Sequence, residues 1–344
     1  MHVHNKQTVD KESNMKYIYF LGAIITLLTS CVGENKSSSA DTLTITIDGT
    51  KDQKIALADY ISRIDSLELK TNADSYLSAI EDFCITDSSL YVLDRNKAVF
   101  RFNRMTGQQE MAAGKSGHGN GEYIEPKRMV FRDNKLHILD MAKNAVMIYD
   151  SEMNYKESVN ISFSAFDFAI VSDGYLFYNL GASDGLKRIV YTDFSGKVLD
   201  SFLEGNGLPE VLYNNKFFSE DEDGNVYFND PLTDEIYWWT NHQMAVFAHM
   251  DYQVNKEEEH KGTNTLSFLA TNQMVVSSYL CDRFVLTSIY DKNSNKSASG
   301  FAMTGTRFPF MPQKVYKGNL YAIFEDPMPE QGYKTFLLIY NSPS

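Results

Sequence analysis

The stretch "FCITDSSLYVLD" (Phe83–Asp94) joins two apolar runs through a short polar turn. An apolar run, a turn rich in Asp, Asn, Gly or Ser, and a second apolar run form the sequence pattern of a β-hairpin. Five further stretches share the pattern: "MVFRDNKLHILD" (Met129–Asp140), "FAIVSDGYLFYN" (Phe168–Asn179), "FFSEDEDGNVYFN" (Phe217–Asn229), "FLATNQMVVSS" (Phe268–Ser278) and "KVYKGNLYAIF" (Lys314–Phe324). The sequence therefore predicts six copies of one hairpin.

The six hairpins are evenly spaced, because equivalent apolar positions recur at steps of 46, 40, 50, 48 and 46 residues. These positions are Leu90, Leu136, Leu176, Val226, Met274 and Leu320. A third apolar run follows each hairpin, and a weaker fourth can be placed after the first four. Four short antiparallel strands per repeat of this length are typical of a β-propeller blade. The predicted fold is all-β, a six-bladed β-propeller over residues 59–344.

The two ends of the repeat region complement each other. The sixth repeat runs out of chain after its third strand, while "RIDSLELKT" (Arg63–Thr71) precedes the first hairpin without a partner of its own. An N-terminal strand that completes the last blade would leave no open edge around the ring. We therefore predict that this strand closes the propeller.

Composition narrows the choice of partners. The chain has 344 residues, of which 43% are hydrophobic and 13% aromatic. A chain of this length can bury a large core, and the aromatic content favours strands. Its formal net charge of −13 argues against nucleic acid as a partner, since a polyanion is bound by clustered Lys and Arg, and the sequence shows no such cluster. We expect a monomer.

The N-terminus carries an export signal. In "MKYIYFLGAIITLLTSC" (Met15–Cys31), one positive charge at Lys16 precedes an uncharged run over Tyr17–Ser30. This run is too short for a membrane span and fits the apolar region of a signal peptide. The last four residues resemble the lipobox of bacterial lipoproteins, in which the cysteine is acylated. We predict a signal peptide over residues 1–30, with Met1 or Met15 as its start, and lipidation of Cys31; a plain secretory signal is the alternative.

Lipidation would place the protein at the cell envelope. More than one acyl chain holds a protein firmly at a membrane surface, whereas a single chain binds only marginally. The following stretch "VGENKSSSAD" (Val32–Asp41) is polar, so residues 31–58 are expected to be a lipidated flexible tether. We expect attachment to the outer membrane, on its periplasmic or its surface side. The two remaining cysteines, Cys84 and Cys281, lie in apolar runs and are expected to be buried free thiols.

Three stretches carry a resemblance to a known group: "ISRIDSLELKT" (Ile61–Thr71), "LYVLD" (Leu90–Asp94) and "GHGNGEYIEP" (Gly117–Pro126). The chain resembles the six-bladed β-propeller lipoproteins of Bacteroidetes, which are akin to the NHL and TolB-like propellers. The third stretch is similar to the G-x-G-x-G-E-Y signature of that group, although Asn120 stands where a proline is common. The resemblance implies architecture and compartment, and it implies no particular reaction.

The glycine-rich stretch "GKSGHGNGEY" (Gly114–Tyr123) superficially resembles a nucleotide-binding loop. The phosphate-binding pattern would need glycine at Gln109 and a helix after the loop, and the dinucleotide pattern fails for the same lack of a helix. A related stretch, "EGNGLPEV" (Glu204–Val211), lies about two repeats later. We interpret both as corners between blades, where glycines supply positive φ and Glu122 accepts hydrogen bonds from backbone N–H groups.

Candidate ligand contacts are few. His118, Glu122 and Tyr123 lie on the glycine-rich loop, and alternation along "EIYWWT" sends Trp238 and Trp239 to opposite faces of a strand. One tryptophan could stack on a sugar ring, but filling the space between blades is the stronger interpretation. One histidine and one acid are too few to hold a metal by themselves. No cofactor is predicted, and calcium bound by carboxylates at the central channel stays an alternative.

The sequence supports two classes of function. One is a binding or interaction module at the cell envelope with a protein or glycan ligand, because no nucleophile motif is present. The alternative is a metal-dependent lactonase- or lyase-like enzyme with its site at the central channel. Sensing for a membrane partner is a third possibility. The residues that line the channel discriminate between the first two.

Overall fold

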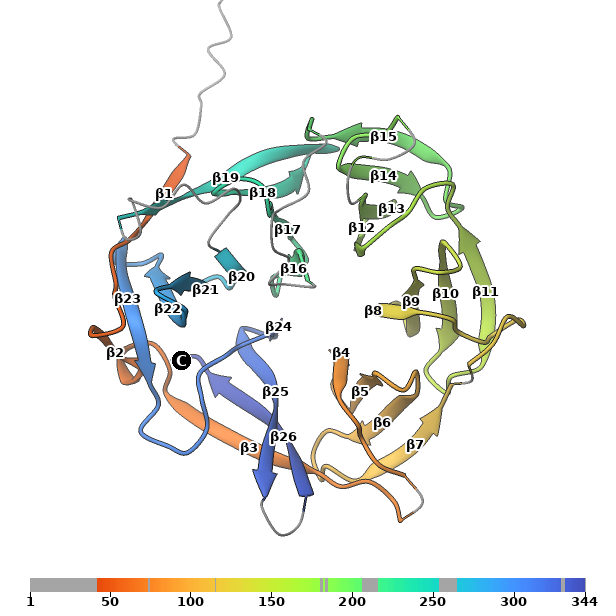
Figure 1. The fold of residues 1–344 in the computed structure, drawn as a ribbon, viewed down its shortest axis with the longest axis horizontal. Helices are drawn as coiled ribbons and strands as arrows, with labels where there is room; N and C mark the ends of the chain where they lie inside the picture. The colour runs from red at the N-terminus through yellow and green to blue at the C-terminus, as the bar shows by residue number, and fades with distance from the viewer. Residues whose placement is uncertain are drawn as a thin grey trace, which may run out of the picture. The chain divides into compact units, whose positions relative to one another are not determined.

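The computed structural model describes residues 42–343 except 74, 115, 180–181, 183–184, 206–215, 254–264 and 329–331. The described residues form six sheets arranged in a ring, and each sheet has four antiparallel strands at its core (Figure 1). The fold is thus a six-bladed β-propeller, as the hairpin repeats predict. The predicted signal peptide and Cys31 lie outside the described residues. Within the described part, no helix is long and apolar enough to cross a membrane.

Each blade has four strands that run from the axis outward. Blade 1 contains β4 (Ile80–Ile85), β5 (Ser89–Asp94), β6 (Val99–Asn103) and β7 (Gln109–Ala113). Blade 2 contains β8 (Pro126–Arg132), β9 (Lys135–Asp140), β10 (Ala145–Asp150) and β11 (Tyr155–Asn160). Blade 3 contains β12 (Asp167–Val171), β13 (Gly174–Tyr178), β14 (Ile189–Asp193) and β15 (Val198–Phe202). Blades 4 and 5 contain β16 (Phe218–Glu220), β17 (Val226–Asn229), β18 (Glu235–Thr240) and β19 (Gln243–Tyr252); and β20 (Thr265–Ala270), β21 (Met274–Cys281), β22 (Phe284–Asp291) and β23 (Lys296–Met303).

Blade 6 confirms the predicted closure of the ring. It contains β24 (Lys314–Tyr316), β25 (Asn319–Met328) and β26 (Gly332–Asn341), and its outermost strand is β3 (Arg63–Leu69) from the N-terminal part of the chain. Strand β3 pairs antiparallel with β26, with Leu67 opposite Leu337 (Figure 1). Because both ends of the chain share one sheet, the ring has no gap between the last and first blades.

The N-terminal segment contributes more than one strand, which corrects the expected tether over residues 31–58. Strand β1 (Leu43–Ile47) pairs in parallel with β19, and β2 (Lys54–Ala56) pairs in parallel with β23. A short 3-10 helix (Leu57–Asp59) leads from β2 toward β3. In β1 the side chains of Ile45 and Ile47 are buried between blades 4 and 5. The propeller therefore begins near residue 43, and the flexible-tether prediction is wrong for these strands.

The core consists of apolar layers between neighbouring blades. Strands β12 and β13 are buried at every position, because a blade covers each of their faces. The outer strand β11 is exposed at Lys156, Glu157 and Asn160. This difference explains why the inner hairpins appear in the sequence as nearly continuous apolar runs, whereas the fourth strands are weak. Cys84 and Cys281 are both buried, as predicted, and neither forms a disulfide within the described residues.

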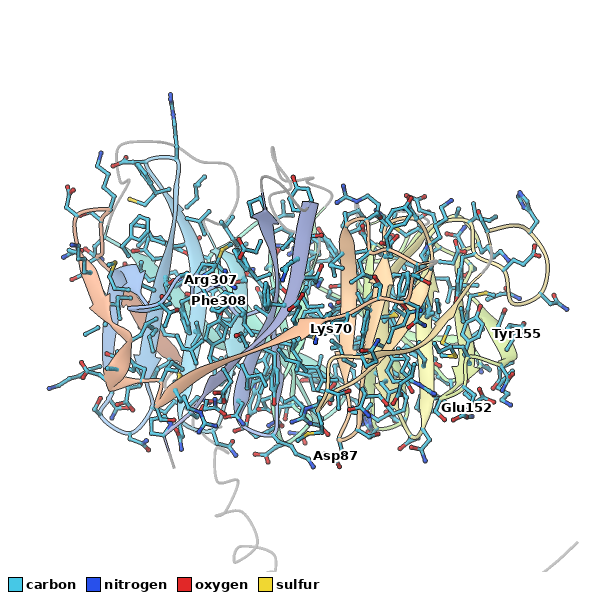
Figure 2. All side chains as sticks on the ribbon, turned by 90° about the horizontal axis from the view of Figure 1, so that it is seen from below. Lys70, Asp87, Glu152, Tyr155, Arg307 and Phe308 are labelled. Atoms are coloured by element: carbon cyan, nitrogen blue, oxygen red, sulfur yellow. The ribbon has the colours of Figure 1, made fainter. Side chains whose placement is uncertain are left out.

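The direction of the strands defines the two faces of the ring. Every innermost strand runs toward the turn that joins it to the second strand of its blade. Asp87 lies in such a turn, and Glu152 lies in the turn between the third and fourth strands of blade 2. Both residues lie on the same rim in the side view (Figure 2). The innermost strands therefore end at this rim and begin at the opposite one.

Candidate functional site

The glycine-rich loop is a structural corner between β7 and β8. Its ends are joined because the Gly117 N–H donates to the Tyr123 carbonyl at 2.8 Å. Glu122 Oε2 accepts from the Gly119 N–H at 2.9 Å, which confirms the expected role of this carboxylate. Gly121 has a φ of +71°, and a side chain there would meet Tyr155. The loop thus turns the chain from one blade to the next.

The three candidate residues of this loop do not form a common binding surface. His118 is exposed, whereas Tyr123 is completely buried. The Tyr123 ring packs against that of Tyr149 with centroids 5.6 Å apart, in the layer between blades 1 and 2. Glu122 is directed back into its own loop. The Tyr123 ring belongs to the core, so the prediction that Tyr123 contacts a ligand is wrong.

The two tryptophans of β18 point to opposite faces of blade 4, as alternation predicts. Trp238 packs near Phe247, with ring centroids 5.8 Å apart, against the layer shared with blade 5. Trp239 packs near Tyr191, at 4.8 Å, against the layer shared with blade 3. Both rings are half-buried and pack against the layers between blades.

The candidate site lies at the axis of the ring, where a cavity of about 650 Å³ is bounded by all six blades. The innermost segment of each blade supplies part of the wall. Representative residues, in blade order, are Phe83, Arg128, Phe168, Lys216, Phe268 and Lys314. Apolar residues and cationic residues both line the wall, so the cavity combines apolar character with charge.

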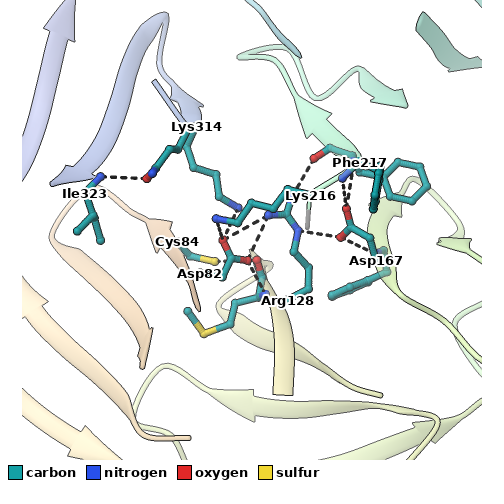
Figure 3. A network of polar contacts seen from close by, with 12 residues as sticks. Asp82, Cys84, Arg128, Asp167, Lys216, Phe217, Lys314 and Ile323 are labelled. Carbon is teal, nitrogen blue, oxygen red and sulfur yellow. Dashed lines mark hydrogen bonds and ion pairs between the residues drawn. The ribbon is translucent and has the colours of Figure 1, made fainter. Parts of the chain in front are cut away.

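Asp82 is the centre of a buried ion network at this cavity (Figure 3). Its carboxylate is fully buried and contacts three cations from three other blades. Arg128 Nη1 lies 3.2 Å from Oδ2, and the ammonium groups of Lys216 and Lys314 lie 2.9 and 3.2 Å from Oδ1. The Met129 N–H donates a further hydrogen bond to Oδ2 at 2.8 Å. One carboxylate therefore joins blades 1, 2, 4 and 6.

Arg128 extends the network across the axis. Its Nε lies 3.0 Å from Asp167 Oδ1, and its Nη2 donates to the Phe218 carbonyl at 2.9 Å. Asp167 Oδ2 accepts from the backbone N–H groups of Phe217 and Phe218 at 2.6 and 3.0 Å. These contacts connect blades 2, 3 and 4, and they satisfy the buried charges with several partners each.

Burial and charge oppose each other at Asp82. Burial alone would raise the pKa of the carboxyl, but the charges of Arg128, Lys216 and Lys314 outweigh it and hold the pKa of Asp82 well below its usual range. Burial lowers the pKa of Lys314, and the nearby Arg128 charge adds to this effect. Burial also raises the pKa of the neighbouring Cys84 thiol to about 12, so that thiol is protonated at neutral pH.

Acidic residues of the wall occupy the other end of the cavity. Glu220 lies at the end of β16 and forms an ion pair with Arg132 at 2.8 Å. Glu222 follows in the next turn, where its Oε1 accepts from the Asn272 N–H at 2.7 Å. Lys216 precedes the same strand. Lys216 and Lys314 thus lie where two of the innermost strands begin, and Glu220 and Glu222 lie where one of them ends.

The channel does not present the carboxylate cluster expected for calcium. In the described ranges, no three His, Cys, Asp or Glu side chains are close enough to hold a metal ion. Asp82, the buried acid beside the cavity, has three cationic side chains around it.

Sequence reasoning missed this network although a repeat signal marks it. Each of six hairpins has a polar residue directly before its first apolar residue, and these polar residues meet at the axis. They are Asp82, Arg128, Asp167, Lys216, Ser267 and Lys314. Aligning the repeats on their first apolar residue would have exposed this position. Which of the charged residues at this position pair with one another can be known only from the geometry of the ring.

Comparisons with known proteins agree with the fold. A family model described as a domain of unknown function, DUF4934, matches residues 42–328. A Bacteroides fragilis protein described as exported has a crystal structure with a TM-score of 0.69 and 14% identity, covering 88% of this chain and 100% of that chain. A DUF4221 member from Bacteroides vulgatus gives a TM-score of 0.53 and 10% identity, with 82% and 98% covered. Identities this low show the fold alone.

A comparison with curated protein sequences found no significant match. The family match begins at residue 42, directly before the first strand of the propeller, and it extends into the last blade. It therefore covers most of the folded unit and most of the whole chain. On this evidence the protein belongs to the DUF4934 family.

Proposed function

We propose that this protein is an exported, lipid-anchored propeller that binds a small ligand in its central cavity at the cell envelope. The observation that carries the proposal is the cavity of about 650 Å³, which is lined by apolar residues and by Lys216 and Lys314. Ligand sites combine apolar walls with a few placed polar groups in cavities of this size. Export is supported by the signal-peptide pattern and by the similarity to a Bacteroides fragilis protein described as exported. The NHL- and TolB-like relationship stays a prediction.

Acylation of Cys31 predicts a direct chemical result. Cells fed an alkyne fatty acid should incorporate the label into the wild-type chain, and Cys31→Ala should lose it completely, because an acyl chain needs that thiol. Cys84→Ala is the matched control, since Cys84 is a buried free thiol and its removal should leave labelling unchanged. Equal labelling of wild type and Cys31→Ala would refute the lipid anchor.

Ligand binding in the cavity can be tested with a library of small fragments. Saturation-transfer NMR on the full chain carrying Cys31→Ala should detect fragments that bind, and adding Ser267→Trp should remove most of these signals. Ser267 lines the cavity, so an indole there fills part of its volume. Glu157→Trp on the exposed outer strand β11 is the control and should leave binding unchanged. Binding that survives Ser267→Trp, or no binding at all, would contradict the proposal.

A further inference from the structure

We infer that the ligand of the central cavity is a small organic anion, with its carboxylate held by Lys216 and Lys314 and its apolar body against the apolar part of the cavity wall. This inference rests on the proposed function, because it names the chemical class that the same cavity selects. It concerns the end of the cavity at which the innermost strands begin.

The charges at this end do not cancel. Three cations, Arg128, Lys216 and Lys314, face two carboxylates, Asp82 and Asp167, so the network carries one net positive charge. An uncompensated charge in a partly buried site is costly, and an anionic ligand would remove that cost. The whole protein is acidic, with a formal net charge of −13, so this positive site differs from the rest of its surface.

Acids elsewhere on the wall have partners of their own. Glu81 lies 3.4 Å from the Lys127 ammonium, and Glu220 pairs with Arg132. Asp221 accepts hydrogen bonds from its own turn, among them one from the Asn225 N–H at 2.9 Å. Glu81 and Glu220 are thus paired with cations outside the network.

Lys216 and Lys314 line the cavity, whereas Asp82 lies beneath them. The side chains of Lys216 and Lys314 are 25% and 19% exposed, while Asp82 is 0% exposed beneath them. Both ammonium groups contact the same oxygen, Asp82 Oδ1, and each ammonium has three N–H donors. Asp82 is the one acid at ion-pair distance from Lys314 within the described residues. Lys314 thus has donor capacity for a second acceptor from the cavity side.

The ammonium groups of the two lysines lie over the same aromatic ring. The ammonium nitrogens of Lys216 and Lys314 lie 5.6 and 5.9 Å from the centroid of the buried Phe83 ring. Attraction between a cation and the ring face holds both groups near one place. The cavity is also lined by the half-buried apolar residues Val130, Phe131 and Val315. A carboxylate attached to an apolar or aromatic body therefore matches the site better than a neutral or cationic molecule.

Three probes of one shape test the charge preference: benzoate, neutral benzamide and cationic benzylamine. Calorimetric titration of the full chain carrying Cys31→Ala should give benzoate an affinity at least tenfold above that of benzamide, with benzylamine weakest. Lys314→Met should reduce benzoate affinity at least tenfold and leave benzamide affinity unchanged. The variant should stay folded, because it leaves two cations facing two carboxylates.

Two controls accompany this measurement. Lys156→Met removes an exposed lysine that also pairs with one aspartate, Asp150, and should leave the preference for benzoate intact. Lys314→Arg keeps the charge and should keep most of the preference. Equal affinities for benzoate and benzamide in the wild type would overturn the anion inference while leaving ligand binding in place. If no probe binds, the anion inference fails, and the fragment screen decides separately whether the cavity binds ligands at all.

Discussion

A chain that begins at residue 70 is expected to lose cooperative unfolding, because it lacks the strand that closes the ring. Strand β3 forms seven residue pairs with β26 and supplies the outer strand of blade 6. It also buries Leu69 in the layer between blades 6 and 1. Without β3, the edge of β26 is open and the junction of the last and first blades loses apolar cover. Urea unfolding followed by circular dichroism should show a broad, non-cooperative transition.

Two other truncations separate closure from the loss of the outer strands. A chain that begins at residue 42 keeps all three N-terminal strands and should unfold like the full chain. A chain that begins at residue 58 lacks β1 and β2 but retains β3, so its unfolding should stay cooperative with a lower midpoint. A synthetic peptide of residues 60–72 should restore cooperativity to the shortest chain. If the chain that begins at residue 70 unfolds, without the peptide, like the chain that begins at residue 42, closure by β3 is not needed for stability.

Asp82→Asn is expected to destabilise the fold by about 3–5 kcal/mol, the usual cost of removing one partner from a buried ion pair. The substitution preserves size but leaves Arg128, Lys216 and Lys314 with Asp167 as the one remaining acid of the network. The free energy of unfolding can be measured by urea titration at pH 7. Glu68→Gln is the control, because Glu68 pairs with Lys334 at the surface, where such pairs contribute about 0–1 kcal/mol. Equal small effects would show that the buried network does not stabilise the ring.

The effect of Asp82→Asn should depend on pH. The pKa of Asp82 is held below its usual range in the folded state, while in the unfolded chain an Asp has a pKa of about 3.9. The stabilisation is therefore complete above the unfolded value and is lost as the pH falls toward the folded value. Wild type and Asp82→Asn should differ most at neutral pH and converge below about pH 4. A constant difference down to pH 3 would contradict this assignment.

The extent of the propeller shows where sequence reasoning failed. Strand β1 has the sequence "LTITI", in which Ile45 and Ile47 are buried and the threonines between them are exposed. This short alternating segment has no hairpin partner nearby, since its partner β19 lies about 200 residues later. Nothing in the neighbouring sequence indicates that it pairs in parallel with an outer strand, and the sequence therefore predicts that it is part of a tether. The hairpins were predictable because both strands and their turn are adjacent in sequence.

The sequence by itself determined the six repeats, the closing role of Arg63–Leu69 and the structural nature of the glycine-rich corner, because each depends on local pattern or on counting strands. Only the tertiary structure decided which charges meet. Asp82, Arg128, Asp167 and Lys216 lie in successive blades, and Lys314 comes from the last blade. Spacing shows that a motif repeats, but closing the ring is what brings the innermost segments of distant repeats to one axis. Only there do isolated polar residues become a buried ion network beside a cavity.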